Sequence, residues 1–395
     1  MTETMEVSAP SLSVGSAVLP GEWSWSPLGE VTLGIYDCPH STPKLTDDGP
    51  YVVRTQDIIS GTFRKAGAAR VSRETYLERI KRAVPTQGDL LYSREGTYFG
   101  IAAEVPEGEE VCLGQRMVLI RPDASVVNYR YLRYWLNSPF MASHVHGSKD
   151  GSVAARLNVS TIRKLPTLLP QLVEQAAIAE TLGALDDKIA VNERIVAAAK
   201  ELGAAKAAQV SASAMESAVL GDILELKYGK SLPAARRVAG EIPVFGSGGI
   251  SGTHIEALLE GPGIIIGRKG TVGSVYWSEG GFFPIDTTFY VVCRGNRVSM
   301  EYAYFLLKGL GLEEMNSDSA VPGLNRDRAL SVRIKVPDAH SIQRFTVEAR
   351  ELFAMLRVRE QENQTLATLR DTLLPQLMSG RIRVKDAEEI VEDHV

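Results

Sequence analysis

The most constraining feature of this 395-residue chain is an internal duplication in which each copy ends in a long helical segment. The dipeptide Leu-Asn occurs at residues 157 and 324, each time about a dozen residues before a proline, Pro170 and Pro337. A segment that favours helix follows each proline, at residues 171–208 and 341–379. The expected order is therefore globule, long helix, globule, long helix.

The match between the copies extends upstream into both globules. Residues 88–97 match 261–271, and residues 27–30 match 219–222. A period this long does not belong to a solenoid array, so it indicates a duplicated module. Duplication gives one polypeptide a pseudo-two-fold axis, and that geometry suits a partner that is itself nearly two-fold, such as duplex DNA.

The two long segments carry the apolar spacing of a coiled-coil seam, with steps that alternate between four and three residues. In the first segment the seam comprises Ile178, Leu182, Leu185, Ile189, Asn192, Val196 and Ala199. In the second it comprises Ile342, Phe345, Ala349, Leu352 and Leu356, and it resumes at Leu366, Leu369, Leu373 and Leu377. A helix of about 38 residues spans roughly 57 Å. Two such helices packed antiparallel are expected to hold the globules apart, with the polar Asn192 controlling register.

Composition limits the class of protein. The chain is 44% hydrophobic and 23% charged, which is typical of a soluble protein, and no apolar run reaches membrane length. Cys38, Cys112 and Cys293 lie far apart without a C-x-x-C pair, so they indicate neither a zinc knuckle nor a disulfide framework. Reduced cytoplasm is the expected compartment.

The net charge of −5 argues weakly against DNA binding, but the distribution of charge matters more than its sum. Residues 54–82 carry eight basic side chains against three acids, and residues 227–237 carry four basic side chains and no acid. Acids gather instead in the last ten residues. One basic stretch in each copy of the module favours a nucleic-acid partner over a merely solvated surface.

Each globule has the pattern of a mixed α/β domain. Strands are expected at residues 50–54, 111–120, 264–266 and 289–292, which are rich in β-branched and aromatic residues. Short helices are expected at the matching positions 128–136 and 299–307, and residues 246–252 form a glycine-rich loop.

At this point the sequence resembles a known family. Residues 168–189 are similar to the central conserved helix of Type I restriction-modification specificity (S) subunits, and residues 369–380 to the end of their second conserved helix. The globules, with Tyr92-Ser93-Arg94-Glu95-Gly96-Thr97 in the first and residues 266–271 in the second, resemble their target recognition domains. The resemblance covers about residues 25–383, with a departure from the family pattern at residues 337–341.

The resemblance implies a fold and a division into segments. The fold class is α/β (α+β): two mixed α/β target recognition domains separated by two long antiparallel coiled-coil helices, with pseudo-two-fold symmetry. The expected segments are a disordered N-terminal tail (1–22), target recognition domain 1 (23–167), the central conserved helix (168–212), target recognition domain 2 (213–337), the C-terminal conserved helix (338–383) and an acidic tail (384–395).

The resemblance also implies a role without catalysis. Such a subunit reads a bipartite DNA target, one half-site per domain, and docks two methyltransferase subunits that use S-adenosylmethionine to methylate adenine. Two motor-nuclease subunits, which use ATP and Mg²⁺, complete the restricting complex. The chain itself is expected to hold no cofactor and no metal. Docking is expected at the paired helices, through Ile178, Leu182, Leu185, Ile189, Asn192, Leu352, Leu356, Leu366 and Leu373.

Fragments that imitate active sites are incomplete. Residues 137–140 differ from the Asn-Pro-Pro-Tyr/Phe box of amino-methyltransferases, and residues 229–231 lack the first glycine of a phosphate-binding loop. No Ser/His/Asp set or paired carboxylates can be assembled from the sequence. Two alternatives stay open: a self-contained DNA methyltransferase, and a coiled-coil scaffold that binds only protein.

Residues that contact DNA should be basic or polar side chains on the loops of the globules. In the first globule the candidates are Arg54, Gln56, Lys65, Arg70, Arg73 and Arg94. In the second they are Lys230, Ser231, Arg236, Arg237, Ser247, His254, Arg268 and Lys269. Arg94 and Arg268 hold equivalent positions, each after an apolar strand and before Gly-Thr, so the alternative for this pair is an internal brace common to both domains.

Overall fold

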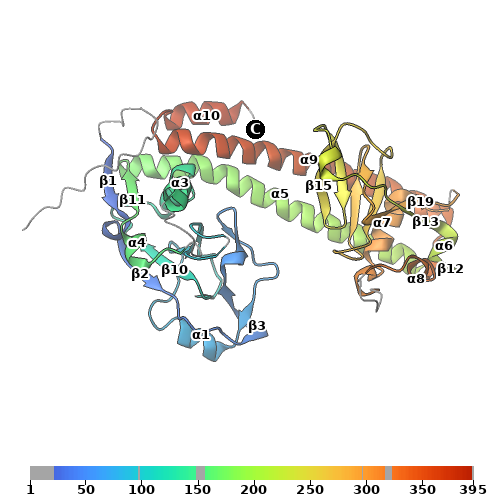
Figure 1. Cartoon of the computed structure of the whole chain (residues 1–395), viewed down its shortest axis with the longest axis horizontal. Coiled ribbons are helices and arrows are strands. Elements are labelled where there is room, and N and C mark those ends of the chain that lie inside the picture. Colours follow the sequence, from blue (N-terminus) through green and yellow to red (C-terminus); the bar gives the residue numbers. More distant parts are fainter. Residues whose placement is uncertain (1–21, 97, 148–155, 296, 316–322, 394–395) are drawn as a thin grey trace, which may run out of the picture. The chain divides into compact units, whose positions relative to one another are not determined.

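The computed structural model describes residues 22–96, 98–147, 156–295, 297–315 and 323–393. The chain forms two compact units, one made of residues up to 190 together with residues from 363 onward, the other of residues 191–362 (Figure 1). Two long helices, α5 (Leu172–Ala212) and α9 (Ala339–Met378), contribute to both units. The predicted helical segments are therefore confirmed. The expected tail at residues 1–22 lies almost entirely outside the described residues.

The globule of unit 1 is built on small sheets. Its four-stranded antiparallel sheet has the order β2 (Thr32–Asp37), β10 (Met117–Pro122), β7 (Leu90–Ser93), β8 (Ala102–Glu104). A three-stranded sheet has the order β6 (Arg70–Val71), β3 (Leu45–Val53), β9 (Val111–Leu113), in which β3 and β9 run parallel. A third ladder pairs β1 (Ser24–Pro27) with β11 (Pro166–Leu169), and a short one pairs β4 (Ile58–Ile59) with β5 (Thr62–Phe63). The helices are α1 (Arg73–Arg79), α2 (Tyr129–Leu136), α3 (Pro139–Gly147) and α4 (Val159–Arg163).

Alternation along the central strands builds two cores, because successive side chains point to opposite faces of a sheet. Leu90, Tyr92, Val118 and Ile120 join the core that holds α2 and the long helices, whereas Leu91 and its neighbours on that face join the core beneath β3 and β9. Both faces of this sheet are therefore buried. This explains why the strand segments are apolar runs rather than alternating patterns.

The apolar run at residues 111–120, expected to be one strand, is two strands in different sheets. A turn at residues 114–116 separates β9 from β10, and Arg116 takes a φ of 68° there. Positive φ is uncommon for a residue with a side chain, so a sequence pattern does not predict it at an arginine. Gly114 is the one residue in this turn that indicates a break between strands.

The globule of unit 2 repeats this architecture. Its four-stranded sheet has the order β13 (Leu224–Tyr228), β19 (Thr288–Cys293), β16 (Gly263–Gly267), β17 (Val275–Ser278). Its three-stranded sheet joins β15 (Gly249–His254), β14 (Ile242–Gly246) and β18 (Phe283–Pro284), the last two parallel. The ladder of β12 (Glu216–Val219) with β20 (Arg333–Val336) and the helices α6 (Leu220–Ile223), α7 (Met300–Lys308) and α8 (Arg326–Leu330) complete the repeat.

Equivalent backbone hydrogen bonds confirm the duplication at atomic detail. The amide of Leu28 donates to the carbonyl of Leu165 at 2.8 Å, and that of Leu220 donates to Val332 at 2.9 Å. The amide of Leu157 donates to Arg94 at 2.8 Å, and that of Leu324 donates to Arg268 at 2.9 Å. The two Leu-Asn dipeptides noted in the sequence therefore hold the same place in both globules.

The long helices pack together and run antiparallel within each unit. In unit 1, Glu174 near the start of α5 pairs with Arg383, just beyond the end of α9, at 2.9 Å. Further along α5, Asp186 pairs with Arg370, which precedes Arg383 in the chain, at 2.7 Å. In unit 2, Lys200 pairs with Glu360 at 3.3 Å and Lys206 pairs with Glu348. The seam of unit 1 buries Ile178, Leu182 and Leu185 of α5 with Leu366, Leu369, Leu373 and Leu377 of α9.

Two helix boundaries add to the sequence prediction. Asp338 accepts hydrogen bonds from the amide and hydroxyl of Ser341 at 3.0 and 2.7 Å, which begins α9 at the place where the family pattern is departed from. The segment expected to be an acidic tail contains a helix, α10 (Val384–Glu392), whose Ala387 is fully buried in the core of unit 1. Its acidic side chains lie on the exposed face.

Candidate nucleic-acid interface

Backbone hydrogen bonds gather three loops of unit 2 at one edge of the four-stranded sheet. The amide of Gly229 donates to Thr288 at 3.1 Å, and that of Lys230 donates to Pro284 at 3.0 Å. The amides of Arg268 and Lys269 both donate to the carbonyl of Thr287, at 2.9 and 3.2 Å. Four of the predicted DNA-contact residues are brought together in this way: Lys230, Ser231, Arg268 and Lys269.

An exposed aromatic ring lies among these basic residues. The guanidinium carbon of Arg268 lies 5.2 Å from the centroid of the Tyr228 ring, and that of Arg326 lies 5.6 Å from it. Tyr228 packs on Phe289 at 5.0 Å but is itself 54% exposed. Tyr228 and Arg326 were not among the residues predicted from the sequence. The only signal for Tyr228 is an exposed aromatic at the end of a strand, next to a lysine.

The hairpin of β14 and β15 holds a second group of predicted residues. Arg237, in the segment before β14, donates from Nη1 to the carbonyl of Ser251 in β15 at 2.7 Å and thereby ties this segment to the hairpin. His254 is buried, and its Nδ1 accepts a hydrogen bond from the amide of Val238 at 3.1 Å, so its ring serves the fold. The carbonyl of Ser247 accepts from the hydroxyl of Tyr276, and Arg236 is exposed.

Charge compensation differs between the two globules. Within the described residues, Lys230, Arg236 and Lys269 of unit 2 are exposed and form no ion pair. In unit 1 the predicted basic residues have acidic or backbone partners. Arg54 pairs with Asp57 at 3.0 Å, Lys65 with Glu109 at 2.6 Å and Arg73 with Glu110 at 2.5 Å, and Arg70 donates to the carbonyl of Gly49 at 2.6 Å. Gln56 is exposed beside the first of these pairs.

Arg94 lies inside unit 1 rather than on its surface. Its side chain is 3% exposed, and Nε lies 3.4 Å from the carboxylate of Asp37. This geometry favours the alternative in which Arg94 is an internal brace of the fold. Arg268, its equivalent, is only half-buried and donates from Nη2 to the backbone carbonyl of Asp286 at 2.7 Å.

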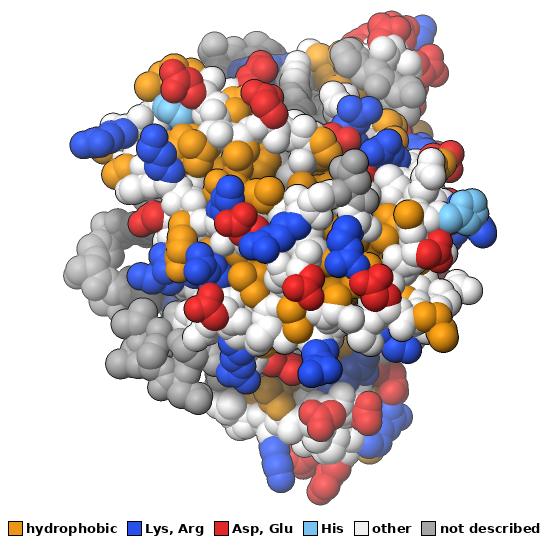
Figure 2. Space-filling view, turned by 90° about the vertical axis from the view of Figure 1, so that its right-hand side faces the viewer, with side chains coloured by type: hydrophobic (Ala, Val, Ile, Leu, Met, Phe, Trp, Pro, Cys, Tyr) orange, Lys and Arg blue, Asp and Glu red, His pale blue; other side chains and the backbone are white. Residues whose placement is uncertain are grey.

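The described residues on the face shown in Figure 2 do not form one large basic field. On the face shown in Figure 2, Lys and Arg side chains are interspersed with Asp and Glu. Local clusters therefore matter more for an anionic partner than the summed potential of the chain, whose net charge is −5.

The residues predicted to dock a partner lie mostly inside the helix packing. Leu182, Leu366 and Leu373 are at most 1% exposed, and the others of the set are buried or half-buried: Ile178, Leu185, Ile189, Asn192, Leu352 and Leu356. The exposed apolar side chains that these helices offer to a partner include Val173, Val191 and Leu202 of α5 and Val347 and Val358 of α9.

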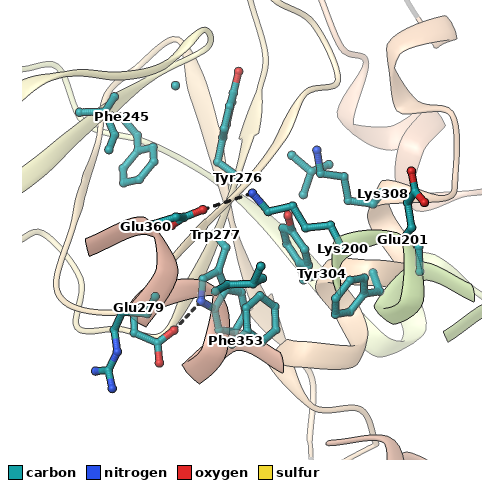
Figure 3. Close-up of a pocket in the computed structure, with 17 residues that line it drawn as sticks. Lys200, Glu201, Phe245, Tyr276, Trp277, Glu279, Tyr304, Lys308, Phe353 and Glu360 are labelled. Carbon is teal, nitrogen blue, oxygen red and sulfur yellow. Dashed lines mark hydrogen bonds and ion pairs between the residues drawn. The ribbon is translucent and has the colours of Figure 1, made fainter. Parts of the chain in front are cut away.

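A cavity of about 740 Å³ lies in unit 2 between the globule and the long helices (Figure 3). Aromatic rings line it, among them Trp277, Tyr304 and Phe353, and the rings of Trp277 and Phe353 stack at 4.2 Å. The Lys200–Glu360 ion pair crosses its rim, and the indole nitrogen of Trp277 donates to Glu279 at 2.7 Å. The corresponding hollow of unit 1 measures about 200 Å³ and is lined by charged residues, Glu104, Arg133 and Asp186.

Two observations bear on metal binding and on thiol chemistry. No group of three or more His, Cys, Asp and Glu side chains that could hold a metal ion occurs among them. Burial raises the pKa of the Cys112 and Cys293 thiols to about 11, which leaves both protonated near neutrality. Within the same residues, no helix has the length and apolar character needed to cross a membrane.

Comparisons with known proteins agree with this architecture. A family model described as the Type I restriction modification DNA specificity domain matches residues 20–201 and again residues 213–363. The EcoprrI Type I restriction enzyme specificity subunit of Escherichia coli is 28% identical over 124 residues, which cover 30% of this chain and 31% of that protein. The crystal structure of a Type I restriction-modification system S subunit from M. genitalium superposes with a TM-score of 0.57 at 20% identity, over 90% of this chain and 96% of that one, and so shares its fold.

Proposed function

We propose a DNA-reading role for this chain, because it belongs to the family of Type I restriction modification DNA specificity domains. In this proposal the chain is the non-catalytic specificity subunit of a Type I restriction-modification complex and reads a bipartite target. The observation that carries the proposal is that the family model matches twice, once on each globule with the helix that follows it. One chain then offers two independent readers.

Each globule reads its own half-site. Side chains on the loops of each globule contact the DNA. Lysines and arginines bind phosphates, and polar side chains discriminate bases in the grooves of the duplex. The uncompensated basic residues of unit 2, Lys230, Arg236 and Lys269, suit the phosphate role. The paired basic residues of unit 1 have to exchange a carboxylate for a phosphate if they are to bind DNA.

The helix pair docks two methyltransferase subunits, and two motor-nuclease subunits join the full complex. The exposed apolar side chains Val191, Leu202 and Val358, which flank the buried seam, suit a helical partner. Chemistry resides in these partners, with S-adenosylmethionine in the methyltransferases and ATP with Mg²⁺ in the motors. The assembly works in the cytoplasm, where the cysteines stay reduced.

Domain exchange tests the division of labour. Replacing residues 216–336 with the equivalent segment of a relative should change one half of the methylated motif, read by methylome sequencing of the host. A change in both halves would refute separate readers. Loss of methylation with an intact complex would show only that the hybrid cannot bind, so the exchange is also made in the first globule at residues 23–167.

Two assays separate the proposal from its alternatives. The purified chain is incubated with labelled S-adenosylmethionine and duplex DNA, and methyl transfer without a partner would identify a self-contained methyltransferase. The same chain is then tested for a mobility shift of duplex DNA over a range of salt concentrations. Binding that weakens as salt rises is expected, whereas no shift at low salt would favour a protein-only scaffold.

The helix pair also sets the distance between half-sites. Seven residues inserted into α5 after Ala190 and seven into α9 after Glu362 lengthen both helices where the two units divide. Seven residues add roughly 10 Å, about three base pairs of 3.4 Å, and two turns keep each helix face within about 20° of its original direction. The non-specific gap in the methylated motif should grow accordingly. An unchanged gap at full activity would mean that the helices do not measure the site.

A further inference from the structure

The equivalent arginines of the two globules have different electrostatic surroundings. Arg94 and Arg268 each follow the central strand of their sheet, and each backbone carbonyl accepts from the leucine of a Leu-Asn dipeptide. Arg94 is 3% exposed and faces the carboxylate of Asp37 at 3.4 Å. Arg268 faces the ring of Tyr228, and its closest polar partner among the described residues is a backbone carbonyl, that of Asp286.

Strand register shows that Tyr228 replaces the compensating acid. In unit 1, Val118 pairs with Tyr92 on one side and with Asp37 on the other. In unit 2, Phe289 pairs with Ile266, the counterpart of Tyr92, and on its other side with Tyr228. Tyr228 therefore stands where Asp37 stands in the first copy. Both copies have the arginine, but at this position unit 1 has a carboxylate and unit 2 has an aromatic ring.

A second guanidinium has been added at the same place. Arg326 is the first residue of α8, and the equivalent first residue of α4 in unit 1 is Val159. The Arg326 side chain is 41% exposed, and its guanidinium lies 5.6 Å from the Tyr228 centroid. Its Nε lies 3.3 Å from the carboxylate of Asp327, which is 85% exposed. Two guanidiniums thus share one ring, and Arg326 alone of the two is paired with an acid among the described residues.

We propose that Tyr228, Arg268 and Arg326 form a binding site for a phosphodiester group of DNA in unit 2, and that the equivalent place in unit 1 is not a DNA contact. The proposal rests on the proposed DNA-reading function. A guanidinium over an aromatic face keeps its in-plane N–H donors available, and two such donors match the oxygens of a phosphate. The solvent-exposed pair with Asp327 is weak enough to be exchanged for a phosphate. The site grips the backbone and carries no base information of its own.

The test measures how DNA binding by the full chain depends on salt. Affinity is measured by fluorescence anisotropy for a duplex with the methylated motif and for one without it, between about 50 and 200 mM salt. Arg326→Gln should make the negative slope of log affinity against log salt shallower by about 0.9, the value for one lost phosphate contact. The variant should bind both duplexes more weakly, and by the same factor. Arg326→Lys should keep the slope, and Tyr228→Leu should make it shallower although it removes no charge.

Two matched controls accompany these variants. Arg328→Gln removes an exposed arginine from the same helix without touching the ring and should leave the slope unchanged. Arg94→Gln removes the unit 1 equivalent and should lower the unfolding temperature while the slope stays at its original value. Thermal unfolding of each variant confirms that the fold is retained at the assay temperature.

The outcomes separate the two claims. A wild-type chain that binds no duplex DNA at low salt refutes the proposed function, and this site falls with it. If the wild-type chain binds DNA while Arg326→Gln keeps the full slope, the site alone is wrong. The last measurement is thermal unfolding with inorganic phosphate. If phosphate stabilises the wild-type chain but not Arg326→Gln, and this variant keeps the salt slope of the wild-type chain for DNA, the site binds a free anion and the proposal is overturned.

Discussion

The two junctions between globule and helices share a backbone arrangement but differ in chemistry. In unit 1 the contact is ionic: Arg133 of α2 pairs with Glu104 at 2.9 Å and with Asp186 of α5 at 3.0 Å, and Asp186 also pairs with Arg370 of α9. In unit 2 it is aromatic: Tyr304 of α7 lies 5.7 Å from Trp277 and 5.5 Å from Phe353 of α9.

These residues occupy corresponding positions. Glu104 pairs with Leu90 across its sheet, and Trp277 pairs with Ile264, the counterpart of Leu90. Arg133 and Tyr304 each lie five residues after the helix N-caps, Asn128 and Ser299. Asp186 and Phe353 each lie sixteen residues after the proline that precedes their long helix, and Arg370 and Gly203 each lie thirty-three residues after it.

The comparison teaches that a junction of this fold tolerates either chemistry as a complete set. A salt-bridge network needs every charge satisfied, and an aromatic cluster needs every ring filled. A change at a single member of either set leaves an unpaired charge, a void or a steric clash. Four predictions test this, from the largest expected effect to the smallest.

Phe353→Ala should cost the most. Phe353 is 6% exposed and stacks on Trp277 with ring centroids 4.2 Å apart, so the substitution opens a void in the core of unit 2. We expect a loss of about 4 kcal/mol in the stability of that unit. Hydrogen exchange should become faster in α7 and stay unchanged in α2. Val358→Ala, at an exposed position of the same helix, is the control, and equal effects of the two variants would contradict the role of the cluster.

Asp186→Asn should be the next most damaging change. Arg133 is 8% exposed and Arg370 19%, and both lose the carboxylate of Asp186, although Glu104 still pairs with Arg133 and Asp371 with Arg370. Breaking a buried pair in this way costs about 3 kcal/mol, here in unit 1. Urea unfolding monitored by hydrogen exchange in α2 measures it. Asp187→Asn, at a position that is 69% exposed, should change stability by less than about 0.5 kcal/mol.

Two glycines of α5 should respond with opposite signs. An alanine Cβ at Gly203 would lie 2.3 Å from the tip of the buried Phe305 ring, whereas at Gly183 the nearest atom is the Nη1 of Arg130 at 3.4 Å. Gly203→Ala should therefore destabilise unit 2 by about 1 kcal/mol, an overpacking cost of about 2 less a helix-propensity gain of about 1. Gly183→Ala should stabilise unit 1 by up to about 1 kcal/mol. Thermal unfolding of both variants that shifts in the same direction would refute the steric account.

The smallest expected effect is a loss of stability of unit 1 at acid pH. Burial of the Asp186 carboxyl raises its pKa, but Arg133, the Tyr134 hydroxyl and Arg370 outweigh burial and hold the pKa below the ordinary 3.8. A depressed pKa contributes stability that is present above 3.8 and is lost as pH falls through the folded value. The protection factors of the α2 amides, which are corrected for the pH dependence of intrinsic exchange, should therefore fall below about pH 4, and Asp186→Asn should remove this part of the response. An unchanged acid profile in Asp186→Asn would contradict the assignment.

Local and periodic features of the sequence were sufficient for the architecture. The four–three spacing from Ile178 onward predicted α5, and the same spacing from Ile342 predicted α9, because helix periodicity is a property of neighbouring residues. Asn128 and Ser299 begin the short helices α2 and α7 by accepting hydrogen bonds from amides two or three residues ahead. The duplication then doubled the weight of each observation.

The site depends on pairings that no local pattern contains. Lys65 and Glu109 are 44 residues apart in sequence, and Arg73 and Glu110 are 37 apart, yet each pair forms an ion pair. Arg94 likewise needs Asp37, which reaches it only through the register of β2 and β10. A basic run in the sequence reports the number of charges but not the acids that fold against them. For this reason the two basic stretches, residues 54–82 and 227–237, supported the prediction of DNA binding equally. In the structure, acidic or backbone partners compensate most of the basic side chains of the first stretch that were predicted to contact DNA.

The division of the chain between its units has a consequence for biosynthesis. Unit 2 is one continuous stretch, residues 191–362, inserted into unit 1, which needs both residues up to 190 and the segment from 363 onward. As the chain leaves the ribosome, unit 2 is synthesised completely before unit 1 is. The core of unit 1 still lacks Leu366, Leu373 and Ala387 at that point. A message cut short before these codons yields a chain with an exposed apolar helix face, a substrate for proteolysis. The core of unit 1 is therefore completed only after the whole of unit 2 has been synthesised.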